Sequence, residues 1–219
     1  MSNFSVIIPV YNEEKNIGVL LDELSDILGS NYEYEIIVVD DKSTDGTIAE
    51  VIKKMNSNKK IKIKYHSINL GQSYCILTGA KQSIYHTLIT IDGDGQNNPK
   101  DIPILLKKFF SSENIKLLGG IRKKRKDTFS KKIASFCANK IRKKILNDNC
   151  DDTGCSLKIF DKNIFIQIPF FDGIHRFLPA LFKGFGYETF FIDVDHRKRL
   201  YGVSKYSNTK RLFRGIKDL

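Results

Sequence analysis

Apolar residues recur along the first part of the chain in two alternating patterns. Short β-branched runs such as Phe4–Val10 have the composition of buried strands, whereas Glu13–Leu28 repeats apolar residues at the three- and four-residue spacing of a helix. Strands that alternate with helices in this way predict an α/β fold with a mostly parallel central sheet flanked by helices. The same patterns predict further strands at Glu35–Asp41, Ile61–His66, His86–Asp92 and Lys116–Gly120, and further helices after a Thr47–Glu50 capping box, at Gln72–Ile84 and at Asp101–Phe110.

The second half of the chain has a less regular pattern. A helix is predicted over Ser130–Leu146, because its apolar residues fall on one face and lysines and arginines occupy the rest. With 219 residues, 41% of them hydrophobic, and no low-complexity linker, the chain fits one domain. The remaining predictions are a strand at Gly154–Phe160, a helix at His175–Lys183, a strand at Tyr187–His196, a loop over Arg197–Tyr206 and a final helix capped by Ser207–Thr209.

The composition argues against several classes of protein. The sequence has no run of about 18 uncharged apolar residues, and its first residues lack the basic segment of a signal peptide, so neither a membrane span nor export is predicted. A zinc site is poorly supported, because Cys150 and Cys155 lack the CxxC spacing and have no histidine nearby. The four cysteines expected to be reduced thiols are Cys75, Cys137, Cys150 and Cys155.

The net charge of +11 is concentrated in two short segments. Between Arg122 and Lys144 the sequence has eleven lysines and arginines against a single acidic residue, Asp127. A second basic cluster begins at Arg197 and continues to Arg214. Such clusters suit the phosphates of a nucleic acid, an anionic lipid or a phosphorylated substrate, whereas the commoner outcome for a charge run is a solvated surface.

Acidic and polar residues directly follow three of the predicted strands, in the segments PVYNEE, VVDDKSTDGT and DGDGQNNP. Ligands of a parallel α/β sheet bind beyond the carboxyl ends of its strands, so we expect these carboxylates to share one rim. Repulsion between carboxylates at such a rim is costly unless a cation or a hydrogen-bonding ligand is present. The strand ends are therefore the first place to expect a bound ligand.

Asp92 and Asp94 stand two positions apart, and Gly93 and Gly95 allow the backbone to bend so that both carboxylates approach one point. Carboxylate oxygens suit Mg²⁺ or Mn²⁺, ions that commonly bridge protein carboxylates and substrate phosphates. The spacing fits an Asx-rich turn that caps the helix after Pro99 equally well. The residues alone leave both interpretations open.

Seven motifs occur in a fixed order: PVYNEE, VVDDKSTDGT, NLGQS, DGDGQNNP, GIRKKR, DDTGCSLK and HRKRLYGVSKY. Together they resemble family 2 glycosyltransferases of the GT-A fold, and more narrowly the polyprenyl-phosphate glycosyltransferases, the dolichol-phosphate mannose synthase-like group. The resemblance covers essentially the whole chain. It implies a single glycosyltransferase catalytic domain over residues 1–219, with a nucleotide-sugar-binding half at 1–120 and an acceptor-binding half at 121–219.

On the donor side, the resemblance implies that Pro9, Tyr11 and Glu13 border the nucleotide base and ribose. It also implies that Asp40 or Asp41 hydrogen-bonds the base or the ribose. The alternative for these two aspartates is capping of the next helix.

At the reacting end of the donor, the resemblance implies that Asp92, Asp94 and Gln96 hold Mg²⁺ or Mn²⁺ and, through it, the diphosphate. The ion would act as a Lewis acid on the leaving nucleoside diphosphate. Asp94 would therefore be catalytic. Asp152 would lie near the donor sugar as a base or sugar binder, and its alternative is a turn residue before a strand.

On the acceptor side, Arg122 matches an arginine that binds the acceptor phosphate in the lipid-phosphate group. Lys131 and Ser135 match a second phosphate-binding pair, although a lysine stands where arginine is usual and lacks the bidentate fork. Arg199 and Lys205 match the loop that closes over the phosphates.

Two further residues, His175 and Arg176, fall in a motif that borders the sugar or the acceptor, and polarity at a helix start is their alternative. The other three histidines (His66, His86 and His196) receive no role.

The sequence is therefore interpreted as a metal-dependent, inverting glycosyltransferase. It would move a sugar from a UDP- or GDP-sugar to a polyprenyl phosphate, peripherally at the cytoplasmic face of a membrane, with the Ser130–Leu146 helix on the anionic lipid surface. One alternative is a growing glycan as acceptor, which has less need of so many cations. A non-catalytic nucleic-acid-binding protein explains the charge and leaves the carboxylates unexplained, so nucleic acid is not an expected partner. The identity of the sugar and the formation of a homo-oligomer stay open.

Overall fold

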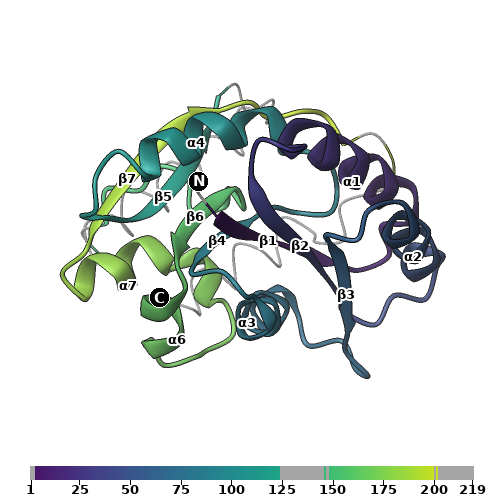
Figure 1. The fold of residues 1–219 in the computed structure, drawn as a ribbon. Helices are drawn as coiled ribbons and strands as arrows, with labels where there is room; N and C mark the ends of the chain where they lie inside the picture. The colour runs from purple at the N-terminus through teal and green to yellow at the C-terminus, as the bar shows by residue number, and fades with distance from the viewer. Residues whose placement is uncertain (1–2, 124–145, 147, 200, 202–219) are drawn as a thin grey trace.

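The computed structural model describes residues 3–123, 146, 148–199 and 201. The described strands form one seven-stranded sheet, with α1, α2 and α4 on one face and α3, α6 and α7 on the other (Figure 1). The strands are β1 (Asn3–Val10), β2 (Glu33–Asp40), β3 (Ile61–Tyr65), β4 (Thr87–Thr90), β5 (Ile115–Arg122), β6 (Lys158–Asp161) and β7 (Glu188–Val194). The helices are α1 (Glu14–Leu28), α2 (Thr47–Ser57), α3 (Gln72–Gln82), α4 (Ile102–Phe109), α6 (Lys162–Gln167) and α7 (Leu178–Gly184), with 3-10 turns η1 (Pro99–Asp101) and η2 (Ile174–Arg176).

The sheet has the order β3-β2-β1-β4-β6-β5-β7. Its neighbouring strands run parallel except where β6 pairs with β4 and β5. The predicted mostly parallel α/β sheet is therefore confirmed. Because β1, β2 and β4 are parallel neighbours, their carboxyl ends open at the same edge.

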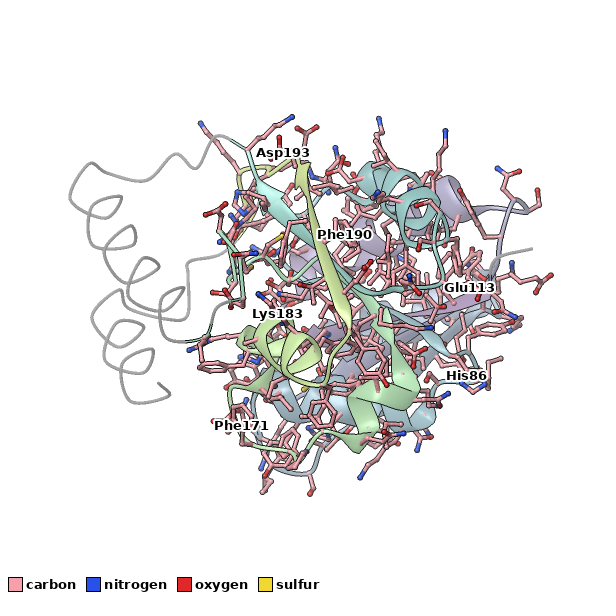
Figure 2. The ribbon with its side chains drawn as sticks, turned by 90° about the vertical axis from the view of Figure 1, so that its left-hand side faces the viewer. His86, Glu113, Phe171, Lys183, Phe190 and Asp193 are labelled. Carbon is pink, nitrogen blue, oxygen red and sulfur yellow. The ribbon has the colours of Figure 1, made fainter. Side chains whose placement is uncertain are left out.

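The central strands of the sheet are buried on both faces, which explains the continuous apolar run of β1. Val6 and Ile8 pack with α1 and α4 in one hydrophobic layer, whereas Ile7, on the other face, packs with α3, α6 and α7. The two edge strands of the described sheet are β3 and β7. Figure 2, turned toward the β7 edge, shows Phe190 and Asp193 along it.

Several sequence predictions are wrong in detail. The Thr47–Glu50 capping box is absent, because Gly46 precedes α2 and no side chain at that position caps the helix. Thr47 Oγ1 instead accepts the Glu13 amide at 2.8 Å, which ties α2 to the loop after β1.

The helix predicted over His175–Lys183 is divided at Phe177 into η2 and α7. The strand predicted from Gly154 begins only at Lys158. Helix α6 was not predicted, because six residues are too few for a periodic signal. Its N-cap is Asp161, whose Oδ1 accepts two amides at its start.

Several predictions lie outside the described residues. They are the Ser130–Leu146 helix apart from Leu146, the final helix after Ser207, and most of the two basic clusters. Cys75 and Cys155 are buried free cysteines, in agreement with the predicted thiols, and Cys150 is buried as well. In the described part of the chain, no helix has the length and apolar character needed to cross a bilayer.

Candidate functional site

The loops that follow β1 and β2 are joined by hydrogen bonds. Asn12, in the left-handed region at φ 53°, accepts the Thr44 amide through Oδ1 at 2.7 Å, and its own amide donates to Ser43 Oγ at 2.8 Å. The two strand ends therefore form one continuous rim. Beside it, Pro9 is half-buried and Tyr11 is exposed.

The two aspartates at the end of β2 have different surroundings. Asp41 accepts the Leu70 and Gly71 amides at 2.8 and 2.7 Å, so its carboxylate is used to hold the NLGQS loop. Asp40 is fully buried, and its Oδ2 accepts the Ser43 amide at 2.9 Å. Asp40 Oδ1 has no hydrogen-bond partner among the described residues, and an unsatisfied buried acceptor costs about 1–3 kcal/mol. Of the two, Asp40 retains capacity for a ligand donor, and its role at the base or ribose stays a prediction.

The loop after β4 bends as its glycines indicate. A Cβ on Gly93 would lie 2.5 Å from Val10 Cγ1, so only glycine allows this approach to β1. Gly95 has a φ of +70°, in the left-handed region. Asp94 Oδ1 accepts the Gln96 amide at 3.0 Å, which is the Asx turn of the alternative interpretation. The cap of the following η1 turn is Asn98, however, so neither aspartate is needed as a helix cap.

Asp92 is held in place from two sides. Its Oδ1 accepts Gln72 Nε2 at 2.7 Å, and its amide donates to Ser156 Oγ at 3.1 Å. Burial and the nearby charge of Asp94 raise the pKa of Asp92 to about 6. A cation placed between the two carboxylates would relieve this repulsion.

Arg199 supplies a positive charge at this rim. Its Nη2 donates to Asp94 Oδ2 at 2.6 Å, and its Nη1 lies 3.7 Å from Glu13 Oε1. The predicted closing loop therefore reaches the ends of both β1 and β4. Asp94, which attracts this guanidinium, and its predicted partners Asp92 and Gln96 offer oxygen ligands of the kind that Mg²⁺ and Mn²⁺ prefer.

The structure brings together two residues that the sequence analysis assigned to different sites. Arg122 Nε and Nη2 donate to the two carboxylate oxygens of Asp152 at 2.6 and 2.7 Å. Burial lowers the pKa of Arg122, but the hydrogen bonds and charge of Asp152 outweigh that effect and raise it. The predicted phosphate ligand and the predicted base therefore form one ion pair, in which Asp152 is buried and Arg122 is partly buried. Their partners in the prediction, Lys131, Ser135 and Lys205, lie outside the described residues.

The first turn of α3 connects the donor rim to the predicted sugar-binding histidine. Ser73 is fully buried, and its hydroxyl accepts the Gly173 amide and contacts His175 Nδ1, both at 2.8 Å. Arg176 follows in η2 and is half-buried. The sequence analysis quoted NLGQS without assigning roles to Gln72 or Ser73, although this motif was the available signal.

A second cluster with metal-ligand chemistry lies behind the rim. Ligand atoms of Asp41, His66 and Cys75 lie within 4.8 Å of one another. His66 contacts Asp41 through Nδ1 and Thr78 through Nε2, each at 2.9 Å, a bonding role that the sequence analysis missed. Burial and the charge of Asp41 raise the pKa of Cys75, which disfavours the thiolate that a metal requires. Hydrogen bonding accounts for this cluster, and the better metal candidates are Asp92, Asp94 and Gln96.

Comparisons with known proteins agree with this geometry. A family model described as Glycosyl transferase family 2 matches residues 5–168. The dodecaprenyl-phosphate galacturonate synthase of Rhizobium johnstonii is 36% identical over 98% of this chain and 64% of its own length. The undecaprenyl-phosphate 4-deoxy-4-formamido-L-arabinose transferase of Pectobacterium carotovorum is 33% identical over 96% of this chain and 64% of its own length. The chain thus spans 64% of the length of both curated relatives.

Solved structures share the fold at low sequence identity. Glucosyl-3-phosphoglycerate synthase from Mycobacterium tuberculosis, in complex with Mg²⁺ and uridine diphosphate, has a TM-score of 0.74 at 15% identity over 99% of this chain and 78% of that chain. Mannosyl-3-phosphoglycerate synthase from Rubrobacter xylanophilus has a TM-score of 0.76 at 13% identity over 99% of this chain and 73% of that chain. These likenesses confirm the predicted fold of the GT-A type.

Proposed function

Because the chain belongs to glycosyl transferase family 2, we propose that it transfers a sugar from a nucleotide-sugar donor to a polyprenyl phosphate with inversion at the anomeric carbon. The observation that carries this proposal is the contact of Arg199 with Asp94, together with its approach to Glu13. This contact joins a cation suited to phosphate with carboxylates at two strand ends. A phosphorylated donor and acceptor would meet at such a place.

Relatives support both substrates of the proposed reaction. The names of the two curated relatives specify polyprenyl phosphates. One solved neighbour contains Mn²⁺ with uridine diphosphate and another contains Mg²⁺ with the same nucleotide. Because the curated relatives are longer than this chain, a polyprenyl phosphate acceptor and a place at a membrane are part of the proposal for this chain.

The donor would lie along the joined ends of β1, β2 and β4. Mg²⁺ or Mn²⁺ held by Asp92, Asp94 and Gln96 would supply Lewis-acid stabilisation of the leaving nucleoside diphosphate. The base and ribose would lie nearer the end of β2, where Asp40 has its unsatisfied oxygen. Pro9, Tyr11 and Glu13 would border them.

The acceptor phosphate would approach from the side of Arg122 and Arg199, assisted by Lys131, Ser135 and Lys205. A phosphate monoester is already anionic near neutral pH, so its oxygen can attack the anomeric carbon without a strong base. Since Asp152 is paired with Arg122, its proposed task is to orient the sugar and the arginine together. His175 and Arg176 would border the sugar or the acceptor.

The site would work where polyprenyl phosphate is found, at the cytoplasmic face of a membrane. We propose that residues 121–219 meet the anionic lipid surface and residues 1–120 hold the donor. A glycan acceptor is the second candidate. The partly buried Arg122 and the rim-facing Arg199 favour a phosphate over a neutral sugar hydroxyl.

A donor panel tests the first half of this proposal. The melting temperature of the protein is measured with a series of UDP- and GDP-sugars, first with Mn²⁺ and then with EDTA. We expect one nucleotide series to stabilise the protein and EDTA to remove that stabilisation, because the diphosphate would bind through the ion. Stabilisation that persists in EDTA would contradict the metal role, and no stabilisation by any donor would contradict the function.

A further inference from the structure

Arg197 makes an unusual number of contacts to the loop that follows β4. Its amide donates to the Gln96 carbonyl at 2.8 Å. Its Nε donates to the Gly95 carbonyl and its Nη2 to the Asn97 carbonyl, both at 3.2 Å. Three successive carbonyls of the loop that carries Asp94 are therefore held by one arginine.

The other side of the same guanidinium is fixed by α1. Nη1 and Nη2 donate to the two carboxylate oxygens of Glu23, each at 2.8 Å. Hydrogen bonding to Arg197 lowers the pKa of Glu23, and the same bonds raise the pKa of Arg197. Both side chains are about one-third exposed, so the pair itself adds little to stability and its importance is geometric. Only arginine has the planar fork that reaches a carboxylate and two carbonyls at once.

The loop that Arg197 holds is also connected to Asp92 through hydrogen bonds. The backbone of Asn97 pairs with that of His196 in an isolated antiparallel β-bridge. Asn97 Oδ1 accepts a hydrogen bond from Ser156 Oγ at 2.7 Å. Ser156 Oγ in turn accepts the Asp92 amide at 3.1 Å. Arg197 therefore lies at one end of a bonded chain that ends at a predicted metal ligand.

Arg199 depends on the same anchor. It lies two residues beyond Arg197, in the segment that runs from β7 toward α1 (Figure 1), and donates to Asp94 at 2.6 Å. With Arg197 held on both sides, the backbone of this segment has a fixed position relative to the Asp94 loop. The contact between Arg199 and Asp94 follows from that position.

We propose that Arg197, oriented by Glu23 of α1, is a positioning residue that holds the Asp94–Asn97 loop and the Arg199 segment in one arrangement. Binding of a divalent cation and a diphosphate at Asp94 then depends on Glu23, a side chain outside the donor site. This inference rests on the proposed function for its ligand, and on the described contacts alone for its geometry.

The test uses the variants Glu23→Gln and Arg197→Lys in the whole chain. Asp22→Asn is the matched control, because Asp22 is the preceding residue of α1 and its carboxylate pairs with Lys54 at 2.5 Å, on α2. Calorimetry measures the affinity for Mn²⁺ with saturating UDP or GDP, whichever the unmodified protein binds. We expect affinity to fall about 10-fold in both variants, as for other residues that orient metal ligands, and to stay unchanged in the control.

Amide hydrogen exchange over residues 92–98 gives a second readout that needs no ligand. We expect faster exchange in Glu23→Gln and Arg197→Lys than in Asp22→Asn, because the loop loses its anchor. The double variant should be no worse than Arg197→Lys alone, since Glu23 acts only by orienting the arginine that this variant already lacks.

The outcomes separate the two proposals. Unchanged exchange and unchanged Mn²⁺ affinity in Glu23→Gln and Arg197→Lys would overturn the positioning role. Faster exchange in a protein whose unmodified form binds neither nucleotide would support the positioning role and overturn the proposed function. A lower melting temperature without either effect would mean that the pair is merely structural, which also overturns the inference.

Discussion

The guanidinium of Arg199 lies between two strand ends, with Nη2 2.6 Å from Asp94 Oδ2 and Nη1 3.7 Å from Glu13 Oε1. These three residues are far apart in the sequence and come from the predicted donor and acceptor halves. Their meeting places the arginine that is predicted to bind the acceptor phosphate directly against Asp94, a predicted metal ligand. Both proposed substrates of the glycosyltransferase would meet at that rim.

Asp94→Asn should reduce sugar transfer by a factor on the order of 100 or more, because the neutral amide no longer holds the cation that offsets charge on the leaving group. The fold should persist, since asparagine keeps an oxygen that can accept the Gln96 amide. Steady-state transfer rates and the melting temperature measure the two effects. Asp193→Asn, which loses only an exposed pair with Lys123, is the control. Near-normal transfer by Asp94→Asn would mean that this loop is only a structural turn and does not hold a cation.

Asp92 should make stability depend on pH. Its pKa in the folded protein, about 6, exceeds the ordinary value of 3.8, so folding favours the protonated form. This contribution is present below about pH 4 and is lost as pH rises through 6, a change of at most about 3 kcal/mol. Asparagine does not ionise, so the variant Asp92→Asn keeps the same contribution at every pH. The free energy of unfolding of Asp92→Asn, relative to that of the unmodified protein, should therefore rise from pH 4 to pH 7. Urea unfolding of both proteins measures this, and a constant difference would contradict the prediction.

The Arg122–Asp152 pair should affect stability as well as activity. Asp152→Ala leaves a partly buried arginine without this partner, and we expect a loss of up to about 3 kcal/mol in the free energy of unfolding. Replacing both residues with leucine should restore much of that stability without restoring transfer. Denaturant unfolding and transfer assays of both variants test this. Unchanged stability in Asp152→Ala, or an active double-leucine variant, would count against the pair.

Gly93 should be intolerant of a side chain because β1 passes so close to it. In Gly93→Ala the new Cβ would lie 2.5 Å from Val10 Cγ1, and we expect a cost of about 1–3 kcal/mol. In a Val10→Ala background the same substitution should cost less, because the clashing methyl group is gone. A double-mutant cycle on the free energy of unfolding measures this coupling. Strictly additive costs would mean that the contact with Val10 does not determine the loop.

Much of the fold could be predicted from the sequence because the spacing of apolar residues within each segment indicates whether it is a strand or a helix. The buried run of β1 and the helical repeat of α1 mark their own positions, and their boundaries differ from the prediction by about one residue, within ordinary assignment scatter. Helix α6 and the break at Phe177 could not be predicted in this way. They depend on one cap and on tertiary contacts rather than on a repeated pattern.

The sequence alone could propose the candidate site as a set of residues, but it could not predict which of them are bonded to one another. The motifs indicated Asp40 and Asp41 together, yet only their surroundings show that Asp41 holds the NLGQS loop. In the same way, the pairing of Arg122 with Asp152 joins two segments 30 residues apart, and no spacing rule reports such a contact. The sequence identifies which acidic and polar residues follow the strands, whereas only the fold shows which group each of these side chains bonds.

Transfer of a sugar to a polyprenyl phosphate can be measured in a two-phase assay. Labelled UDP- and GDP-sugars are incubated with the protein, undecaprenyl phosphate in detergent and Mn²⁺, and the label is then partitioned between organic and aqueous phases. The account predicts label in the organic phase that requires the ion and is lost in Asp94→Asn and Arg199→Ala. Label that enters only a water-soluble glycan, or organic-phase label unaffected by Arg199→Ala, would contradict it.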